Sequence, residues 1–82
     1  MRGVKPQALR TKRERLQMAD DWWTQAHAAI DYFKCTPRSL GNWERGSHKP
    51  IDVFKDRVIV FMETSDVTLL RFSKSLREVS CD

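Results

Sequence analysis

Cysteine, glycine and proline are scarce in this sequence, and long apolar runs are missing. The 82 residues include two cysteines, three glycines and three prolines. Two cysteines without a CxxC pair are too few for a disulfide scaffold. No apolar stretch approaches the roughly 20 residues of a membrane-spanning helix, and the N-terminus lacks the apolar core of a signal peptide. We therefore expect a cytoplasmic protein with no membrane partner.

Charge is unevenly distributed along a chain whose composition, 40% hydrophobic and 32% charged residues, is that of a globular protein. Residues 1–50 carry ten Lys and Arg against five Asp and Glu, a net charge of +5, whereas residues 51–82 carry five against six, a net charge of −1. A basic front half indicates a polyanionic partner. The length indicates one domain, and a second subunit would add to the limited surface that so short a chain buries.

Patterns for catalysis and metal binding are also missing. The spacing of His27, His48 and Cys35 fits no usual zinc pattern, and nothing in the sequence orients Cys35 as a nucleophile. No Gly-rich phosphate loop occurs. Asp20 and Asp21 are better explained as caps and negative charge at a helix start than as acid–base machinery. We therefore expect no enzyme activity, no cofactor and no bound metal.

An all-α fold of about five helices is expected. The clearest helix is 37–45, because Thr36 is a good N-cap, Pro37 suits the first helical position and Gly46 suits the left-handed position that closes a helix. The sequence after residue 56 also fits a strand hairpin, which is the alternative there. The spacing of apolar residues predicts the other helices over about 7–17, 21–33 and 51–63 and within 64–82, after a flexible basic arm of residues 1–6.

The three tryptophans have different expected places. Trp22 and Trp43 lie at helical spacing from other apolar residues and are expected in the core. For Trp23, the edge of the core and a surface for a partner both stay open. Stacking of Trp22 and Trp23 on bases of a single strand is the alternative for the adjacent pair.

The helices expected over 21–33 and 37–45 are joined by about three residues, and the second is short, capped and polar on one face. Such a pair is typical of the helix-turn-helix, whose second helix lies in the major groove and contacts base edges near its N-terminus. The fork of Arg38 suits guanine O6 and N7, and Asn42, one turn later, suits adenine N6 and N7. Ser39 is short enough to reach a base or a phosphate.

The stretch TPRSLGNWERGSHKP, residues 36–50, resembles the recognition helix and following loop of the lambda-repressor-like (Xre-type) helix-turn-helix family. The stretch ALRTKRERLQM resembles the first helix of that family, and the resemblance covers roughly residues 7–62. It implies an atypical small repressor of the phage or plasmid type. Pro37 is expected among the base contacts, together with Arg38, Ser39 and Asn42. The residues that match the family pattern are Thr36, Ser39, Leu40, Trp43, Glu44, Gly46 and Pro50.

The resemblance also implies an ion pair between Arg13 and Glu44, because an Arg of the first helix pairs in that family with the Glu of the Trp-Glu motif. The sequence departs from the pattern in two places. Lys34 stands where the family usually has a glycine, and the spacing from Met18 to Trp43 is several residues longer.

Contacts to DNA phosphates are expected around the recognition helix. They give affinity and orientation but no choice of sequence. The expected residues are Arg45, His48 and Lys49 after that helix, Lys34 before it, and Thr24 and Gln25 near the start of the preceding helix.

Together these features predict a sequence-specific DNA-binding transcriptional regulator, a nucleoid-associated repressor that binds a palindromic site on double-stranded DNA as a homodimer. Residues 7–63 would form the DNA-binding domain and 64–82 a dimerisation helix packed on it. Two alternatives stay open: an antitoxin whose C-terminal part binds a toxin, and a protein-interaction module on the same fold. The residues expected at the dimer interface are Val58, Phe61, Leu69, Phe72, Leu76 and Val79.

Overall fold

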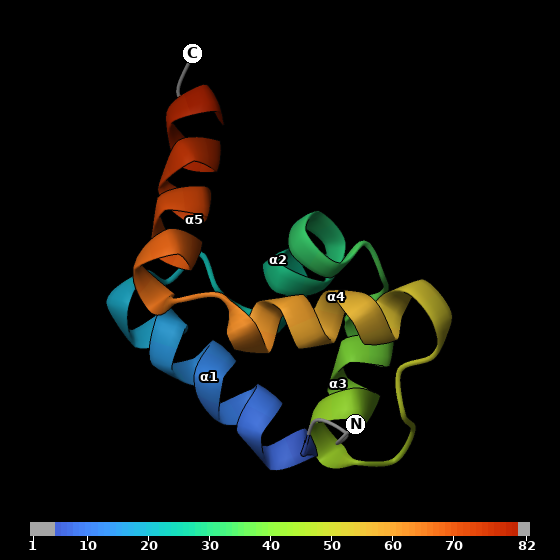
Figure 1. Ribbon diagram of the computed structural model, residues 1–82. Helices are drawn as coiled ribbons and strands as arrows, with labels where there is room; N and C mark the ends of the chain where they lie inside the picture. The colour runs from blue at the N-terminus through green and yellow to red at the C-terminus, as the bar shows by residue number, and fades with distance from the viewer. Residues whose placement is uncertain (1–4, 81–82) are drawn as a thin grey trace.

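The computed structural model describes residues 5–80, and every side chain in that range except those of residue 52 and residues 77–80. Within this part of the chain every regular element is a helix (Figure 1), which confirms the all-α prediction. Helices also occupy residues 57–63 and 66–80, where a strand hairpin was the alternative. The elements are α1 (Pro6–Ala19), α2 (Gln25–His27), the π-helix η1 (Ala28–Phe33), α3 (Pro37–Arg45), α4 (Asp52–Glu63) and α5 (Asp66–Ser80).

Helix α1 begins at Pro6, where the fixed φ of proline suits the first helical position. The basic arm expected over residues 1–6 is therefore one residue too long at its end, and residues 1–4 lie outside the described part of the chain. One face of α1 is buried, at the spacing of three and four residues that places side chains above one another on a helix. That face carries Leu9, Lys12, Arg13 and Leu16.

The helix expected over residues 21–33 starts later than predicted, and two hydrogen bonds explain why. After α1 the backbone of Asp20 is extended, and its carboxylate accepts a hydrogen bond from the Trp22 N–H at 3.1 Å. Thr24 is the N-cap of α2, with its hydroxyl accepting from the His27 N–H at 3.2 Å. The two aspartates therefore belong to the turn before the helix, and Thr24 has the capping role that was expected of them.

Because the residues between α1 and α2 are not helical, both adjacent indoles can point inward. Trp22 is 8% exposed and Trp23 is fully buried, so the prediction for Trp22 is confirmed and Trp23 belongs to the core. Their rings meet edge to face with centroids 4.9 Å apart. The rings of Tyr32, Phe61 and Phe72 pack around them. Neither indole has the exposed face that stacking on a base requires.

Trp43 confirms its prediction as well, since it is 6% exposed and packs against the rings of Phe33 and Phe54. The core is therefore continuous from the aromatic cluster at the α1–α2 turn to the inner face of α3. Its buried hydrophobic residues are Leu9, Leu16, Trp22, Trp23, Ala28, Ala29, Phe33, Leu40, Trp43, Val58, Phe61 and Leu69.

Helix α4 crosses the other helices, and α5 extends away from them (Figure 1). The molecule is therefore elongated, with extents of 40 × 22 × 21 Å. Polar contacts join α5 to α1 and to the turn that follows it. Arg15 donates to both oxygens of Asp66 at 2.7 and 2.9 Å, and the Ser73 hydroxyl donates to the Asp20 carboxylate at 2.7 Å.

The expected dimer interface needs correction. Val58, Phe61 and Leu69 are each 1% exposed or less, because they fill the core beneath α4 and α5, and they leave no surface for a second chain to contact. Phe72 and Leu76 are partly buried and pack against the same core. The side chain of Val79 lies outside the described residues.

Candidate nucleic-acid interface

The turn between η1 and α3 is made by three residues. Lys34 ends the π-helix in the left-handed conformation, with φ 61° and ψ 43°. The Cys35 N–H then donates to the Ala29 carbonyl at 2.8 Å, and Arg57 of α4 donates to the Phe33 carbonyl at 2.8 Å. These bonds satisfy carbonyls that a helix end leaves without partners. The turn is thus closed tightly enough for α3 to follow at once.

Both ends of α3 are fixed by capping, and its predicted bounds are confirmed. Thr36 accepts a hydrogen bond from the Ser39 N–H at 3.1 Å, and its hydroxyl donates to the Ser39 hydroxyl at 3.0 Å. At the other end Gly46 has φ 79°, and its N–H donates to the Trp43 carbonyl at 3.2 Å. A short helix needs such caps, because few of its backbone groups have partners inside it.

A buried ion pair ties α3 to α1, which confirms the pair of Arg13 and Glu44. Arg13 Nε donates to Glu44 Oε2 at 2.5 Å, and Nη2 donates to Oε1 at 3.3 Å. The remaining Arg13 nitrogen, Nη1, donates to the Trp23 carbonyl and to the Gln17 side chain, each at 3.1 Å. The charges are therefore both paired and hydrogen-bonded, which burial demands of them.

Gln25, at the first position of α2, belongs to the same network. Its Nε2 donates to Glu44 Oε1 at 3.0 Å. The Gln25 amide also lies against Gly41, 3.3 Å from the point that a Cβ there would occupy. A side chain predicted to contact a phosphate thus links α2 to α3. Thr24, the other residue predicted there, caps α2 and is partly buried.

Of the residues predicted to contact bases, Arg38, Ser39 and Asn42 share the outer face of α3, whereas Pro37, at its first position, lies in line with buried Gly41 and Glu44. Arg38 is exposed, and Pro37, Ser39 and Asn42 are partly exposed. The opposite face of α3 is buried, through Leu40 and Trp43 among others, so the helix presents one polar face to solvent. This arrangement is what insertion into a major groove requires of a helix.

Four basic residues predicted to contact phosphates lie near the two ends of α3. Lys34 precedes its N-terminus, whereas Arg45, His48 and Lys49 stand at or after its C-terminus, and all four are exposed. Arg45 differs from the other three, because its Nη2 donates to Asn42 Oδ1 at 2.5 Å. Lys34 and Lys49 thus add positive charge on either side of the polar face, and His48 lies beside Lys49.

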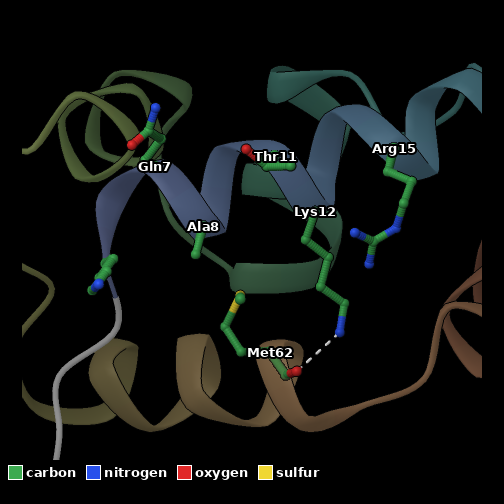
Figure 2. A pocket seen from close by; sticks show the side chains of 7 residues that line it. Gln7, Ala8, Thr11, Lys12, Arg15 and Met62 are labelled. Carbon is green, nitrogen blue, oxygen red and sulfur yellow. Dashed lines mark hydrogen bonds between the residues drawn. The ribbon is translucent and has the colours of Figure 1, made fainter.

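Sequence reasoning missed Lys12. Its Nζ donates to the Met62 carbonyl at 3.1 Å and to the Thr64 carbonyl, at the C-terminal end of α4, and burial lowers its pKa. Lys12 lies at the spacing of the buried residues of α1, and this position could have predicted that its ammonium group binds polar partners, because a buried lysine needs them. Figure 2 shows Lys12 reaching across an open depression of about 460 Å³ between α1 and Met62. Arg15 lines the same depression and pairs with Asp66.

Comparison of the chain with protein-family models, with curated proteins and with solved structures gives no match. Among the described residues no group of three or more His, Cys, Asp or Glu side chains is arranged to hold a metal ion. None of the helices in the described part of the chain has the length and apolar composition needed to cross a bilayer.

Proposed function

We propose that this protein is a sequence-specific DNA-binding transcriptional regulator that acts as a repressor by occupying its site. The observation that supports this most strongly is the construction of α3. It is a short helix capped at both ends and fixed to α1 and α2 by a buried network, with Arg38, Ser39 and Asn42 on its solvent-facing side. A recognition helix must be held in a fixed position, because hydrogen bonds to base edges depend on position within fractions of an ångström.

The charge distribution supports the same proposal. The net charge of +5 in residues 1–50 attracts a polyanion, and α3 lies in that half. Lys34, His48 and Lys49 would contact phosphates on either side of the groove, while Arg38 would donate two hydrogen bonds to a guanine. The phosphate contacts supply most of the affinity and the base contacts supply the choice of sequence.

A homodimer on a palindromic site completes the proposal. Two copies would place two α3 helices about one turn of DNA apart, so that each contacts one half-site. Of the residues predicted at the interface, Val58, Phe61 and Leu69 belong to the core, and Phe72 and Leu76 on α5 are the partly buried ones. Analytical ultracentrifugation of the free protein and of the DNA complex would give the number of chains in each.

Fluorescence anisotropy with two labelled duplexes tests the function directly. One duplex carries the DNA upstream of the protein's own gene, the other a scrambled sequence, each at low and at physiological salt. We expect a preference of about 10³-fold or more that persists at physiological salt. Equal binding to both duplexes, abolished by salt, would contradict the proposal, because it would mean that the basic half senses phosphate alone.

Replacing Arg38 by alanine tests the role of α3. We expect Arg38→Ala to weaken binding to the preferred duplex by about 1–3 kcal/mol and to relax selection at one base position. Arg71→Ala is the matched control, because it removes an exposed arginine from α5 and leaves α3 intact. An unchanged sequence preference in Arg38→Ala would remove Arg38 from the base contacts.

A further inference from the structure

The guanidinium of Arg45 is folded back along α3. Its Nη2 donates to Oδ1 of Asn42 at 2.5 Å. Its Nη1 lies 3.2 Å from the point that a Cβ on Gly41 would occupy. Gly41 therefore leaves the room in which Arg45 lies against the helix, and any side chain there would crowd the guanidinium.

This contact changes what Asn42 offers to a base. An asparagine amide has one oxygen that accepts hydrogen bonds and one NH₂ group that donates them. Adenine requires both, since the oxygen must accept from N6 while the nitrogen donates to N7. In this structure a cationic guanidinium already donates to the oxygen and takes one of its two lone pairs, so the oxygen is a poorer acceptor for adenine N6, whereas the NH₂ group can still donate to a base.

The positive charge of Arg45 also favours guanine over adenine. The major-groove edge of guanine presents two acceptors, N7 and O6, whereas the edge of adenine presents one acceptor and an amino group. A positive guanidinium beside the amide attracts the two guanine acceptors and repels the hydrogens of the adenine amino group. The Arg45 and Asn42 side chains together therefore present several N–H donors and a single weakened acceptor.

We propose that Arg45 and Asn42 act as one unit that selects guanine at the base position facing Asn42. This inference rests on the proposed function and refines it. Arg45 is then a positioning residue for Asn42, not one of the phosphate contacts. Gly41 favours the contact, because a Cβ there would force the guanidinium to shift by a few tenths of an ångström.

Selection from a randomised double-stranded DNA library, read by sequencing, tests the inference. The full-length protein is compared with Asn42→Ala, which identifies the base position that Asn42 faces by losing selection there. We expect wild type to prefer guanine at that position. Arg45→Met, which keeps the length of the side chain and removes its donors, should shift the ratio of adenine to guanine by about tenfold towards adenine.

Two further variants separate positioning from a general loss of charge. Arg45→Lys keeps a donor and a positive charge, and it should retain the guanine preference. Lys49→Ala removes a nearby exposed charge, and it should weaken binding to all sequences without changing the preferred base. Circular dichroism of each variant establishes that the helices are retained.

The outcomes distinguish the two proposals. A wild-type protein that selects no sequence at any position would refute the proposed function itself. Selection of adenine at the Asn42 position by wild type, or an unchanged base ratio in Arg45→Met, would overturn the Arg45–Asn42 unit and leave the proposed function standing. A uniform loss in Arg45→Met that matches Lys49→Ala would also overturn it, because Arg45 would then be a phosphate contact.

Discussion

At the scale of single residues, Arg13 and Glu44 tolerate substitution least, because they form a buried ion pair. Their side chains are 8% and 3% exposed, so both charges have left water. Such a pair is tolerable only when its hydrogen-bonding groups have partners, and here Trp23, Gln17 and Gln25 supply them. The pair adds little stability by being present, but the loss of either partner leaves an uncompensated charge in the core.

We expect Glu44→Gln to lower the free energy of unfolding by about 3–5 kcal/mol. The substitution keeps the shape of the side chain and removes the charge that compensates Arg13. For a domain whose total stability is about 5–15 kcal/mol, this is a large share. Urea denaturation followed by circular dichroism measures the change.

Glu14→Gln is the matched control, since Glu14 pairs with Arg10 on the exposed face of α1. We expect no measurable change there, because exposed pairs contribute little. A loss below about 1 kcal/mol in Glu44→Gln would show that the core tolerates Arg13 unpaired, against the general cost of a buried charge.

At the scale of elements, the turn between η1 and α3 depends on one strained residue. Lys34 has φ 61°, a conformation that costs a residue with a Cβ about 1–2 kcal/mol and that glycine adopts without that penalty. A lysine in this place is consistent with a functional use of its charge.

We expect Lys34→Gly to raise the free energy of unfolding by about 1 kcal/mol and to weaken DNA binding at the same time. The variant removes the backbone strain at residue 34, and it also removes the positive charge of Lys34 on the N-terminal side of α3. The slope of log affinity against log salt concentration should fall by about 1 unit, as for the loss of one phosphate contact. Urea denaturation and anisotropy titrations at several salt concentrations measure the two effects.

Lys34→Ala separates strain from charge, because it keeps the Cβ and loses the ammonium group. It should bind DNA as weakly as Lys34→Gly without the gain in stability. Unaltered DNA affinity in both variants would remove Lys34 from the phosphate contacts and leave the strained turn without a functional reason.

The same region shows what local sequence can and cannot predict. The bounds of α3 follow from Thr36, Pro37 and Gly46, because capping is a property of neighbouring residues. The start of α2 was misjudged, since an aspartate caps a helix as well as a threonine does. The Asp20 carboxylate instead accepts hydrogen bonds from the Trp22 N–H and from the hydroxyl of Ser73, and the second of these residues is distant in sequence. The π-helical winding of η1 gave no sequence signal either.

At the scale of the whole molecule, α5 is held to the rest by contacts near its N-terminal half. Arg15 and Asp66 form one of them, with side chains 55% and 35% exposed. The hydrogen bond from Arg15 lowers the pKa of the Asp66 carboxyl below its ordinary value. A lowered pKa means that the folded protein favours the charged carboxylate, so this contact stabilises the fold only while Asp66 is ionised.

We expect the stability difference between wild type and Asp66→Asn to depend on pH. The difference is fully present above the unfolded pKa of about 4 and disappears as the pH falls through the lower folded pKa. It should not exceed about 1 kcal/mol, because the pair is partly exposed. Urea denaturation of both proteins between pH 7 and pH 2 measures it, and a difference that stays constant over this range would contradict the assignment.

The arrangement of the whole molecule also explains the failed part of the dimer prediction. A stripe of apolar residues looks the same in sequence whether it meets another helix of its own chain or a second copy. Phe61 and Leu69 were placed at a dimer interface on such a stripe, yet they pack beneath the crossing of α1, α4 and α5. By contrast, the pair of Arg13 and Glu44 was predictable because the Trp-Glu motif specifies residues, not only apolarity.

The aromatic cluster gives this protein an intrinsic spectroscopic probe of its packing. Trp22 and Trp23 lie 4.9 Å apart with their planes at 83°, so their electronic transitions couple and should give a strong near-ultraviolet circular dichroism band. That band disappears when side-chain packing is lost, even where helices persist. Trp43 lies apart from them, against the inner face of α3. Dichroism from the pair therefore reports on the packing of α5 through Phe72, without any attached label.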